Sequence, residues 1–307
     1  MSNIPKVVLI TGANGLLGQK LIDLYLQHPE KKIIATGLGP CRHPRKDSFE
    51  YLELDITKEQ EVKDIFLKTR PDTLIHTAAM TNVEACELDH EACDLLNVHA
   101  VKYLAEACNL NHTQMVHIST DFIFNGEHGP LDETEQPEPL SYYGHSKLKG
   151  ENLVTSICQK WVILRTVLVY GVVNDMSRSN IVLWAKGALE KGQNIKVVDD
   201  QFRTPTLAED LAMGCFLSED QNASGIYNIS GADFMSIFEL VERVADFFKL
   251  DKSIMQKSDS KTLNQPAKRP PITGFKVDKA KRELAYKPHS FEEGLAVIKA
   301  QLNIASK

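Results

Sequence analysis

The sequence predicts an α/β fold in which a doubly wound parallel sheet is followed by a smaller, mixed α/β lobe at the C-terminus. Three observations predict it. Short β-branched runs alternate with segments of helical periodicity through the first half of the chain, a pattern typical of parallel sheets covered by helices. A glycine-rich turn follows the first run directly. The chain has 307 residues, which is enough for one large domain and an appended lobe.

The strands of the predicted sheet are short segments such as the β-branched run at residues 6–10 and the alternating residues 51–55. They cover residues 6–10, 32–36, 51–55, 73–78, 115–119 and 161–169. Apolar residues with helical spacing predict helices over residues 16–27, 58–69 and 84–108. Right-handed crossovers would place the C-terminal ends of these strands along one edge of the sheet, where open α/β sheets bind ligands.

The glycine-rich turn reads TGANGLLG from Thr11 to Gly18. Glycines let the backbone approach a pyrophosphate, whose charge the N–H groups at the start of the helix would stabilise. The turn therefore predicts a dinucleotide site of Rossmann type, with a turn used only for packing as the alternative. The predicted cofactor contacts are Gly12, Asn14, Gly15, Leu16, Leu17 and Gly18, with Asp55 and Ile56 beside the adenine. Asp55 has the alternative of capping the next helix.

The end of the second strand favours NADPH over NADH. Folds that prefer NAD usually carry an acidic residue there for the ribose 2′-hydroxyl, and residues 35–39 contain none. A basic segment follows, which would neutralise a 2′-phosphate; a solvated basic loop is the alternative. Its members are Arg42, His43, Arg45 and Lys46.

After Gly171 the pattern becomes mixed. It predicts helices over residues 180–191, 207–219, 236–248 and 291–302, and short strands over 195–198 and 225–229. We therefore assign residues 1–170 to a dinucleotide-binding domain that carries the catalytic residues. Residues 171–307 form the predicted substrate-binding lobe, with some segments returning to the first domain. The polar, proline-containing residues 258–271 predict a surface loop, which would serve substrate binding if it faces the cleft.

Bulk composition points to a cytoplasmic protein with no nucleic-acid or membrane partner. The net charge is −6, which argues against a nucleic-acid surface, and no apolar run reaches membrane-spanning length. The six cysteines include no CxxC pair, so we expect reduced thiols rather than a zinc site.

Tyr143 and Lys147 lie four residues apart, which on one helix brings the phenol and the ammonium together. Ser119 and Thr120 end a predicted strand upstream. Reducing a ketone requires a proton donor at its oxygen, and Tyr143 is the predicted donor. Lys147 and an oxidised nicotinamide would lower the pKa of Tyr143 from about 10 by roughly 3 units, while Thr120 would hydrogen-bond the substrate oxygen. The alternatives are that Thr120 only caps the end of the strand and that Tyr143 and Lys147 lie on the surface of their helix.

Over nearly the whole chain these residues resemble an extended short-chain dehydrogenase/reductase, specifically the dTDP-4-dehydrorhamnose reductase family. The resemblance rests on TGANGLLG from Thr11, AAMTNVE from Ala78, Asn97-Val98, STDFIFNG from Ser119, PLSYYGHSK from Pro139, LRT from Leu164 and DQFRTPT from Asp200. It implies that Thr120, Tyr143 and Lys147 form the catalytic set. Cofactor contacts would come from Arg42, Ala78, Ala79, Met80, Asn97, Tyr143 and Lys147. Substrate contacts would come from Thr81, Val83, Glu84, Thr120, Asp121, Leu168, Asn180 and Arg203.

The resemblance implies NADPH-dependent reduction of the 4-keto group of a nucleotide-linked 6-deoxyhexose, namely dTDP-4-dehydrorhamnose to dTDP-L-rhamnose, in a homodimer. Related dehydratases place a glutamate where this chain has Phe122, so dehydration is disfavoured. Two departures bear on the substrate. Leu168 replaces a tryptophan typical of members, and Arg203 replaces a glycine, so that its guanidinium would grip a diphosphate or another anion.

Two other functions stay open. The family includes the regulatory beta subunit of methionine adenosyltransferase, a partner-binding protein, although this chain keeps the whole catalytic set. A sugar epimerase would use the same loop and Tyr–Lys pair while retaining NAD. Metal dependence is also open. Glu84, Glu87 and Asp89 are acidic, but a solvated helix face explains them more simply, and no metal ligands are predicted.

Overall fold

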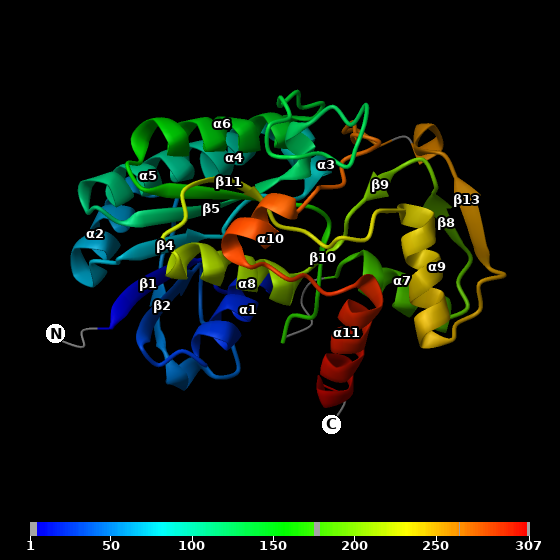
Figure 1. Ribbon diagram of the computed structural model, residues 1–307, viewed down its shortest axis with the longest axis horizontal. Helices are drawn as coiled ribbons and strands as arrows, with labels where there is room; N and C mark the ends of the chain where they lie inside the picture. The colour runs from blue at the N-terminus through cyan, green and yellow to red at the C-terminus, as the bar shows by residue number, and fades with distance from the viewer. Residues whose placement is uncertain (1–4, 175–178, 264, 306–307) are drawn as a thin grey trace.

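The larger part of the protein is built on a seven-stranded parallel sheet in a computed structural model, which describes residues 5–174, 179–263 and 265–305. The strand order is β11-β6-β5-β4-β1-β2-β3, and every neighbouring pair is parallel. The strands are β1 (Lys6–Thr11), β2 (Lys31–Gly37), β3 (Glu50–Glu53), β4 (Thr73–His76), β5 (Gln114–Thr120), β6 (Trp161–Thr166) and β11 (Gly225–Asn228). This arrangement confirms the predicted Rossmann-type sheet (Figure 1).

Helices cover both faces of this sheet (Figure 1). One face carries α2 (Glu59–Thr69), α5 (Ala100–Leu110) and α6 (Tyr142–Ile157), and the other carries α1 (Leu16–Tyr25), α8 (Ala208–Asp220) and α10 (Asp278–Leu284). Each layer has its own apolar core: Leu9 packs with Leu104 on the first face, and Ile10 packs with Leu211 on the second. Because successive strand residues point to opposite faces, one β1 strand supplies both cores.

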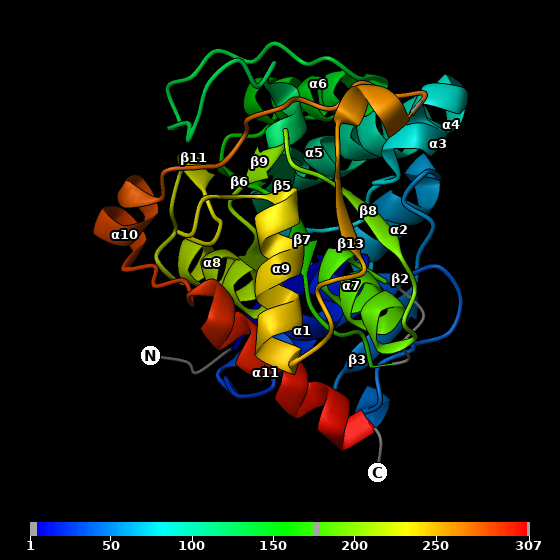
Figure 2. The same cartoon turned by 90° about the vertical axis from the view of Figure 1, so that its right-hand side faces the viewer.

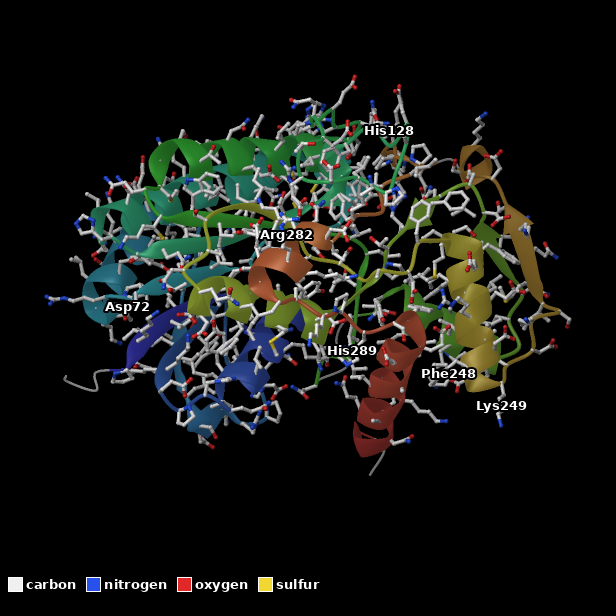
Figure 3. The ribbon with its side chains drawn as sticks, in the orientation of Figure 1. Asp72, His128, Phe248, Lys249, Arg282 and His289 are labelled. Carbon is white, nitrogen blue, oxygen red and sulfur yellow. The ribbon has the colours of Figure 1, made fainter. Side chains whose placement is uncertain are left out.

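The smaller lobe is mixed, as predicted. It contains the helices α7 (Ile181–Glu190), α9 (Ile237–Phe248) and α11 (Phe291–Ala305). Its short strands pair as β8 (Ile195–Val198) with β13 (Met255–Ser258), β9 (Phe202–Arg203) with β12 (Met235–Ser236), and β7 (Val169–Tyr170) with β10 (Thr206–Leu207). Figure 2 shows α9 and β13 on the outer side of this lobe. Figure 3 places Phe248 there, at the opposite end of the molecule from Asp72 just before β4.

Part of the second half of the chain returns to the sheet. The strand predicted at residues 225–229 is β11, which pairs with β6, and α8 packs beneath the sheet through Leu211 and Cys215. The boundary at residues 170–171 stays a prediction. Whatever its position, the sheet is completed by residues from both halves.

Two predicted elements are wrong in extent. The helix expected over residues 84–108 breaks at Asp89, whose carboxylate accepts the N–H of Ala92 and so caps a new helix. The pieces are α3 (Val83–Leu88), α4 (His90–Asp94) and a π-helical segment, η2 (Leu95–His99), that leads into α5. The strand expected over residues 161–169 ends at Thr166 because Leu168 has a φ of 41°, which interrupts an extended backbone.

Short 3₁₀ turns complete the described structure at η1 (Lys46–Ser48), η3 (Asp121–Ile123) and η4 (Ser260–Leu263). Within the described residues, every helix is too short or too polar to cross a bilayer.

Candidate active site

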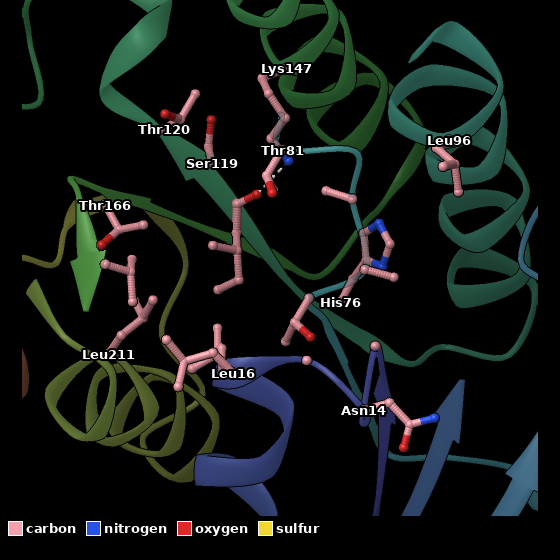
Figure 4. Close-up of a pocket in the computed structure, with 18 of the residues that line it drawn as sticks. Asn14, Leu16, His76, Thr81, Leu96, Ser119, Thr120, Lys147, Thr166 and Leu211 are labelled. Carbon is pink, nitrogen blue, oxygen red and sulfur yellow. Dashed lines mark hydrogen bonds between the residues drawn. The ribbon is translucent and has the colours of Figure 1, made fainter. Parts of the chain in front are cut away.

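A cleft of about 720 Å³ opens where β1, β2, β4 and β5 end, and the smaller lobe closes its other side. It lies on the sheet edge where the sequence predicts ligand binding. Figure 4 shows Asn14 and Leu16 on one side of the cavity, with Ser119, Thr120 and Lys147 on the other. The cleft therefore brings the predicted phosphate loop and the predicted catalytic residues into one space.

The phosphate loop leaves the N-terminus of α1 open to the cleft. The helix begins after Gly15 with no side-chain cap and no acidic residue in its first turn, so its N–H groups are suited to an anion. Gly12 has a φ of 74°, and a Cβ there would lie 2.8 Å from the backbone N of Ala78. Gly18 does not line the cleft. A Cβ at Gly18 would lie 2.3 Å from the Gly12 carbonyl oxygen, so this glycine permits packing.

The basic segment after β2 is mostly turned away from the cleft. Arg42 lines the cleft and the other three basic residues do not. His43 is buried, with Nε2 3.3 Å from Asp23, and Arg45 forms an ion pair with the same carboxylate. The prediction that all four would neutralise a 2′-phosphate is therefore wrong for His43 and Arg45, which face Asp23. For Lys46 it stays a prediction.

Asp55 and Ile56 line the cleft beside this segment. The Asp55 carboxylate accepts the N–H and the hydroxyl of Thr57 at 3.0 and 2.7 Å. Helix α2 begins later, with Lys58 at its N-cap position. The alternative role of Asp55 as the helix cap is therefore wrong.

Tyr143 and Lys147 lie one turn apart near the start of α6, which Ser141 caps by accepting the N–H of Gly144. Both side chains line the cleft, and they are only 8% and 4% exposed, so the helix-surface alternative is wrong. Lys147 Nζ donates a hydrogen bond of 2.7 Å to the Ile118 carbonyl on β5 (Figure 4). This bond holds the ammonium against the end of the strand that carries Thr120.

The pKa of Tyr143 is raised rather than lowered. Burial raises it, a hydrogen bond with Thr120 lowers it in part, and the charge of Asp121 raises it further. Burial also lowers the pKa of Lys147, to about 8. The expected depression depends on an oxidised nicotinamide beside Tyr143 and stays a prediction. A raised pKa keeps the phenol protonated at neutral pH, as a proton donor requires.

Thr120 and Ser119 use their hydroxyls differently. Thr120 Oγ1 donates to Asp121 at 3.1 Å and accepts the N–H of Phe122 at 3.3 Å. Ser119 also lines the cleft, and its buried hydroxyl has no hydrogen-bond partner among the described residues. Thr120 also lowers the pKa of Tyr143, which favours it over Ser119, and its catalytic role stays a prediction.

Arg203 is committed to the protein itself. Its Nη1 donates to the carbonyls of Phe202 and Pro271 at 2.7 and 2.9 Å, and Nη2 donates to the Pro270 carbonyl at 2.7 Å. Its Nε lies 3.5 Å from Asp121, a buried carboxylate that also accepts the Thr273 hydroxyl. Arg203 lines the cleft, and three of its five N–H groups donate to backbone carbonyls. The expectation that it grips a diphosphate or another anion stays a prediction.

Other predicted substrate contacts line the cleft while also shaping its wall. Thr81, Val83 and Leu168 do so. Asn180 caps α7 by accepting the N–H groups of Val182 and Leu183, and it donates to the Gly171 carbonyl. The wall at this end is thus built by the same polar groups that were expected to bind substrate.

Glu84 does not line the cleft, but its partner Arg269 does. The two form an ion pair at 2.6 Å. Arg269 Nη1 has no hydrogen-bond partner among the described residues. Sequence reasoning missed Arg269, although it predicted a surface loop over residues 258–271 that would serve substrate binding if it faces the cleft. That loop is partly buried: Ala267 packs against Tyr143 and Val83.

Asn97 and Met80 lie behind the cleft wall instead of lining it, whereas Ala78 and Ala79 line it as predicted. The Asn97 side chain accepts the Met80 N–H at 2.9 Å, and it donates to the Met80 carbonyl and to the Ser146 hydroxyl, both at 3.0 Å. It therefore ties the turn after β4 to α6.

The acidic residues on α3 have separate partners. Glu87 accepts the N–H of Tyr142 at 3.0 Å, Glu84 pairs with Arg269, and Asp89 caps α4. Across the described ranges, no three histidine, cysteine or acidic side chains gather in a way that suits a metal ion.

Comparisons with known proteins agree with the fold. The family model described as "RmlD substrate binding domain" matches residues 6–304. A dTDP-4-dehydrorhamnose reductase of Aggregatibacter actinomycetemcomitans is 29% identical, over 95% of this chain and 98% of that protein. The methionine adenosyltransferase 2 subunit beta of Xenopus tropicalis is 33% identical, over 80% of this chain and 73% of that protein. The crystal structure of a dTDP-4-dehydrorhamnose reductase from Bacillus anthracis in complex with NADP has a TM-score of 0.84 and 26% identity, covering 97% of this chain and all (100%) of that one.

Proposed function

This chain belongs to the dTDP-4-dehydrorhamnose reductase family, and from that premise we propose that it reduces the 4-keto group of a nucleotide-linked 6-deoxyhexose with NADPH. The proposed reaction converts dTDP-4-dehydrorhamnose to dTDP-L-rhamnose. At the coarser level the chain is an NAD(P)-dependent oxidoreductase. The observation that carries the proposal is the meeting of Thr120, Tyr143 and Lys147 in one cleft with the open N-terminus of α1.

The residues around the cleft divide the work of such a reduction. Gly12, Gly15 and the first N–H groups of α1 would hold the pyrophosphate, and Lys147 would hold the nicotinamide ribose. When bound, NADPH supplies the hydride to the carbonyl carbon. Tyr143 gives its phenolic proton to the carbonyl oxygen, which Thr120 positions by a hydrogen bond. The product is an alcohol, and Tyr143 is left as a phenolate beside the positive charge of Lys147.

Replacing Tyr143 by phenylalanine tests this function. Purified wild-type chain should consume NADPH when given dTDP-4-dehydrorhamnose. Tyr143→Phe should lose about 10²- to 10⁴-fold in kcat, the range that a positioned proton donor contributes. Binding of NADPH, followed by its fluorescence, should be preserved. Tyr103→Phe, in α5 beside α6 and absent from the cleft lining, serves as the matched control. Full turnover by Tyr143→Phe would refute the mechanism.

The 33% identity to a methionine adenosyltransferase beta subunit favours one second candidate, a regulatory subunit. It predicts that the chain raises the activity of a methionine adenosyltransferase catalytic subunit while consuming no NADPH with any ketosugar. Isomerised sugar without NADPH consumption would favour the epimerase alternative instead.

A homodimer belongs to the leading proposal, and light scattering on the purified chain measures its mass in solution.

A further inference from the structure

The Asn14 side chain, a predicted cofactor contact, is fully used inside the protein. Its Nδ2 lies 3.2 Å from the Leu38 carbonyl, 3.1 Å from the Pro40 carbonyl and 3.1 Å from Tyr51 Oη. Its Oδ1 accepts the backbone N–H of Arg42 at 2.9 Å. An amide has two N–H donors, and three acceptors already share them. Asn14 thus links the phosphate loop to residues 38–42.

Tyr51 completes this link from β3. Its hydroxyl donates to the Gly39 carbonyl at 2.8 Å and accepts from Asn14. A Cβ placed on Gly37 would lie 3.2 Å from Tyr51 Oη and 3.4 Å from Asn14 Nδ2. The phenol and the amide therefore crowd the end of β2, where an NAD-preferring fold carries its acidic side chain. An acidic side chain that binds the ribose 2′-hydroxyl would have little room here, because Asn14 and Tyr51 fill the space and hold residues 38–42.

Residues 38–42, held in this way, end at Arg42, the member of the basic segment that lines the cleft. Arg42 lines the cleft, whereas His43 and Arg45 face Asp23. The loop includes Gly39, at a φ of 67°, and an untethered glycine loop would sample many conformations. A guanidinium binds phosphate strongly when its geometry is fixed. Fixing the Arg42 backbone N–H is therefore a direct way to fix where its side chain starts.

We infer that Asn14 is a positioning residue for recognition of the adenosine 2′-phosphate, acting through Arg42 and the 38–42 loop rather than by touching the cofactor. This inference rests on the NADPH part of the proposed function. It assigns the phosphate selectivity to a chain of contacts from the phosphate loop, through one amide, to a single arginine. Tyr51 acts in the same chain from the other side of the loop.

A double-mutant cycle on cofactor binding tests the inference without any sugar. The dissociation constants of NADPH and NADH are measured by fluorescence for wild type, Asn14→Ala, Arg42→Ala and the double variant. Asn14→Ala should weaken NADPH binding about tenfold, the equivalent of one or two hydrogen bonds, and change NADH binding by no more than about twofold. The double variant should be about as weak as Arg42→Ala alone, because the two residues act in series.

Tyr51→Phe and Asn303→Ala frame the result. Tyr51→Phe keeps the ring but removes the bond to Gly39, so it should weaken NADPH binding in the same direction by a smaller factor; it carries the test if Asn14→Ala does not fold. Asn303→Ala, at an exposed position of α11, should change neither constant.

Each other outcome overturns a different statement. Equal weakening of NADPH and NADH in Asn14→Ala, or effects that add in the double variant, would overturn the inference alone. Wild type that binds NADPH no more tightly than NADH would overturn the cofactor choice of the proposed function, and the inference with it.

Discussion

The two ends of the cleft use their polar groups in opposite ways. At the cofactor end, one continuous turn leaves the N–H groups of α1 without side-chain caps. At the substrate end, Asn180 caps α7 and Arg203 binds three backbone carbonyls. The N–H groups at the cofactor end are open to an anion, whereas Asn180 and Arg203 at the substrate end already hydrogen-bond within the protein. Arg269 also lines this end and pairs with Glu84, and we propose that it contributes to binding of the sugar nucleotide.

The two arginines that were expected to bind phosphates offer the sharpest contrast. Arg203→Met should destabilise the fold by about 3–5 kcal/mol, because it leaves the buried Asp121 carboxylate and three carbonyl oxygens without the guanidinium. Arg42→Met should change the free energy of unfolding by less, by about 1 kcal/mol or below, because Arg42 is exposed and contacts of exposed charged side chains contribute little. Urea unfolding of both variants measures the gap. Similar stabilities for the two would show that the Arg203 contacts contribute little and would remove the contrast.

Lys147 stands where the two ends meet and should make stability depend on pH. Burial lowers its pKa from 10.5 to about 8. Between those values the unfolded chain binds more protons than the native one, so the contribution of this group to the unfolding free energy rises with pH. The unfolding free energy of wild type minus that of Lys147→Met should therefore rise by about 3 kcal/mol from pH 7 to 10.5. The same comparison with Lys102→Met, on the exposed face of α5, should stay flat. A flat profile for Lys147→Met would mean that its ammonium is not destabilised by burial.

Arg269 should act on the sugar nucleotide and not on the cofactor. Arg269→Gln should raise the KM for the nucleotide sugar about tenfold, the loss of one charge-assisted hydrogen bond, with a smaller change in kcat. The KM for NADPH should be unchanged. Arg282→Gln, on the exposed surface of α10, is the control. An unchanged sugar KM would leave the substrate end without its proposed cation.

The contrast between the two ends also explains what sequence could predict. The phosphate loop and the Tyr143–Lys147 pair depend on neighbours a few residues away, so local spacing placed them correctly. The commitment of Arg203 depends on the Pro270 and Pro271 carbonyls, far along the chain, and no local pattern records that contact. The break at Asp89 did leave a signal, because aspartate is a preferred helix cap, but the apolar periodicity around it outweighed that signal.

The return of β11 to the sheet has a consequence for recombination between relatives. A chimera that takes residues 1–170 from one member and the remainder from another would pair β6 of the first parent with β11 of the second. It would also seat the second parent's α8 on the first parent's β-sheet core. The C-terminal half therefore cannot be exchanged as a module by a single crossover at that point. Exchange that preserves the fold must carry matched β6–β11 and α1–α8 surfaces, or leave β11 and α8 in place and swap the segments that flank them.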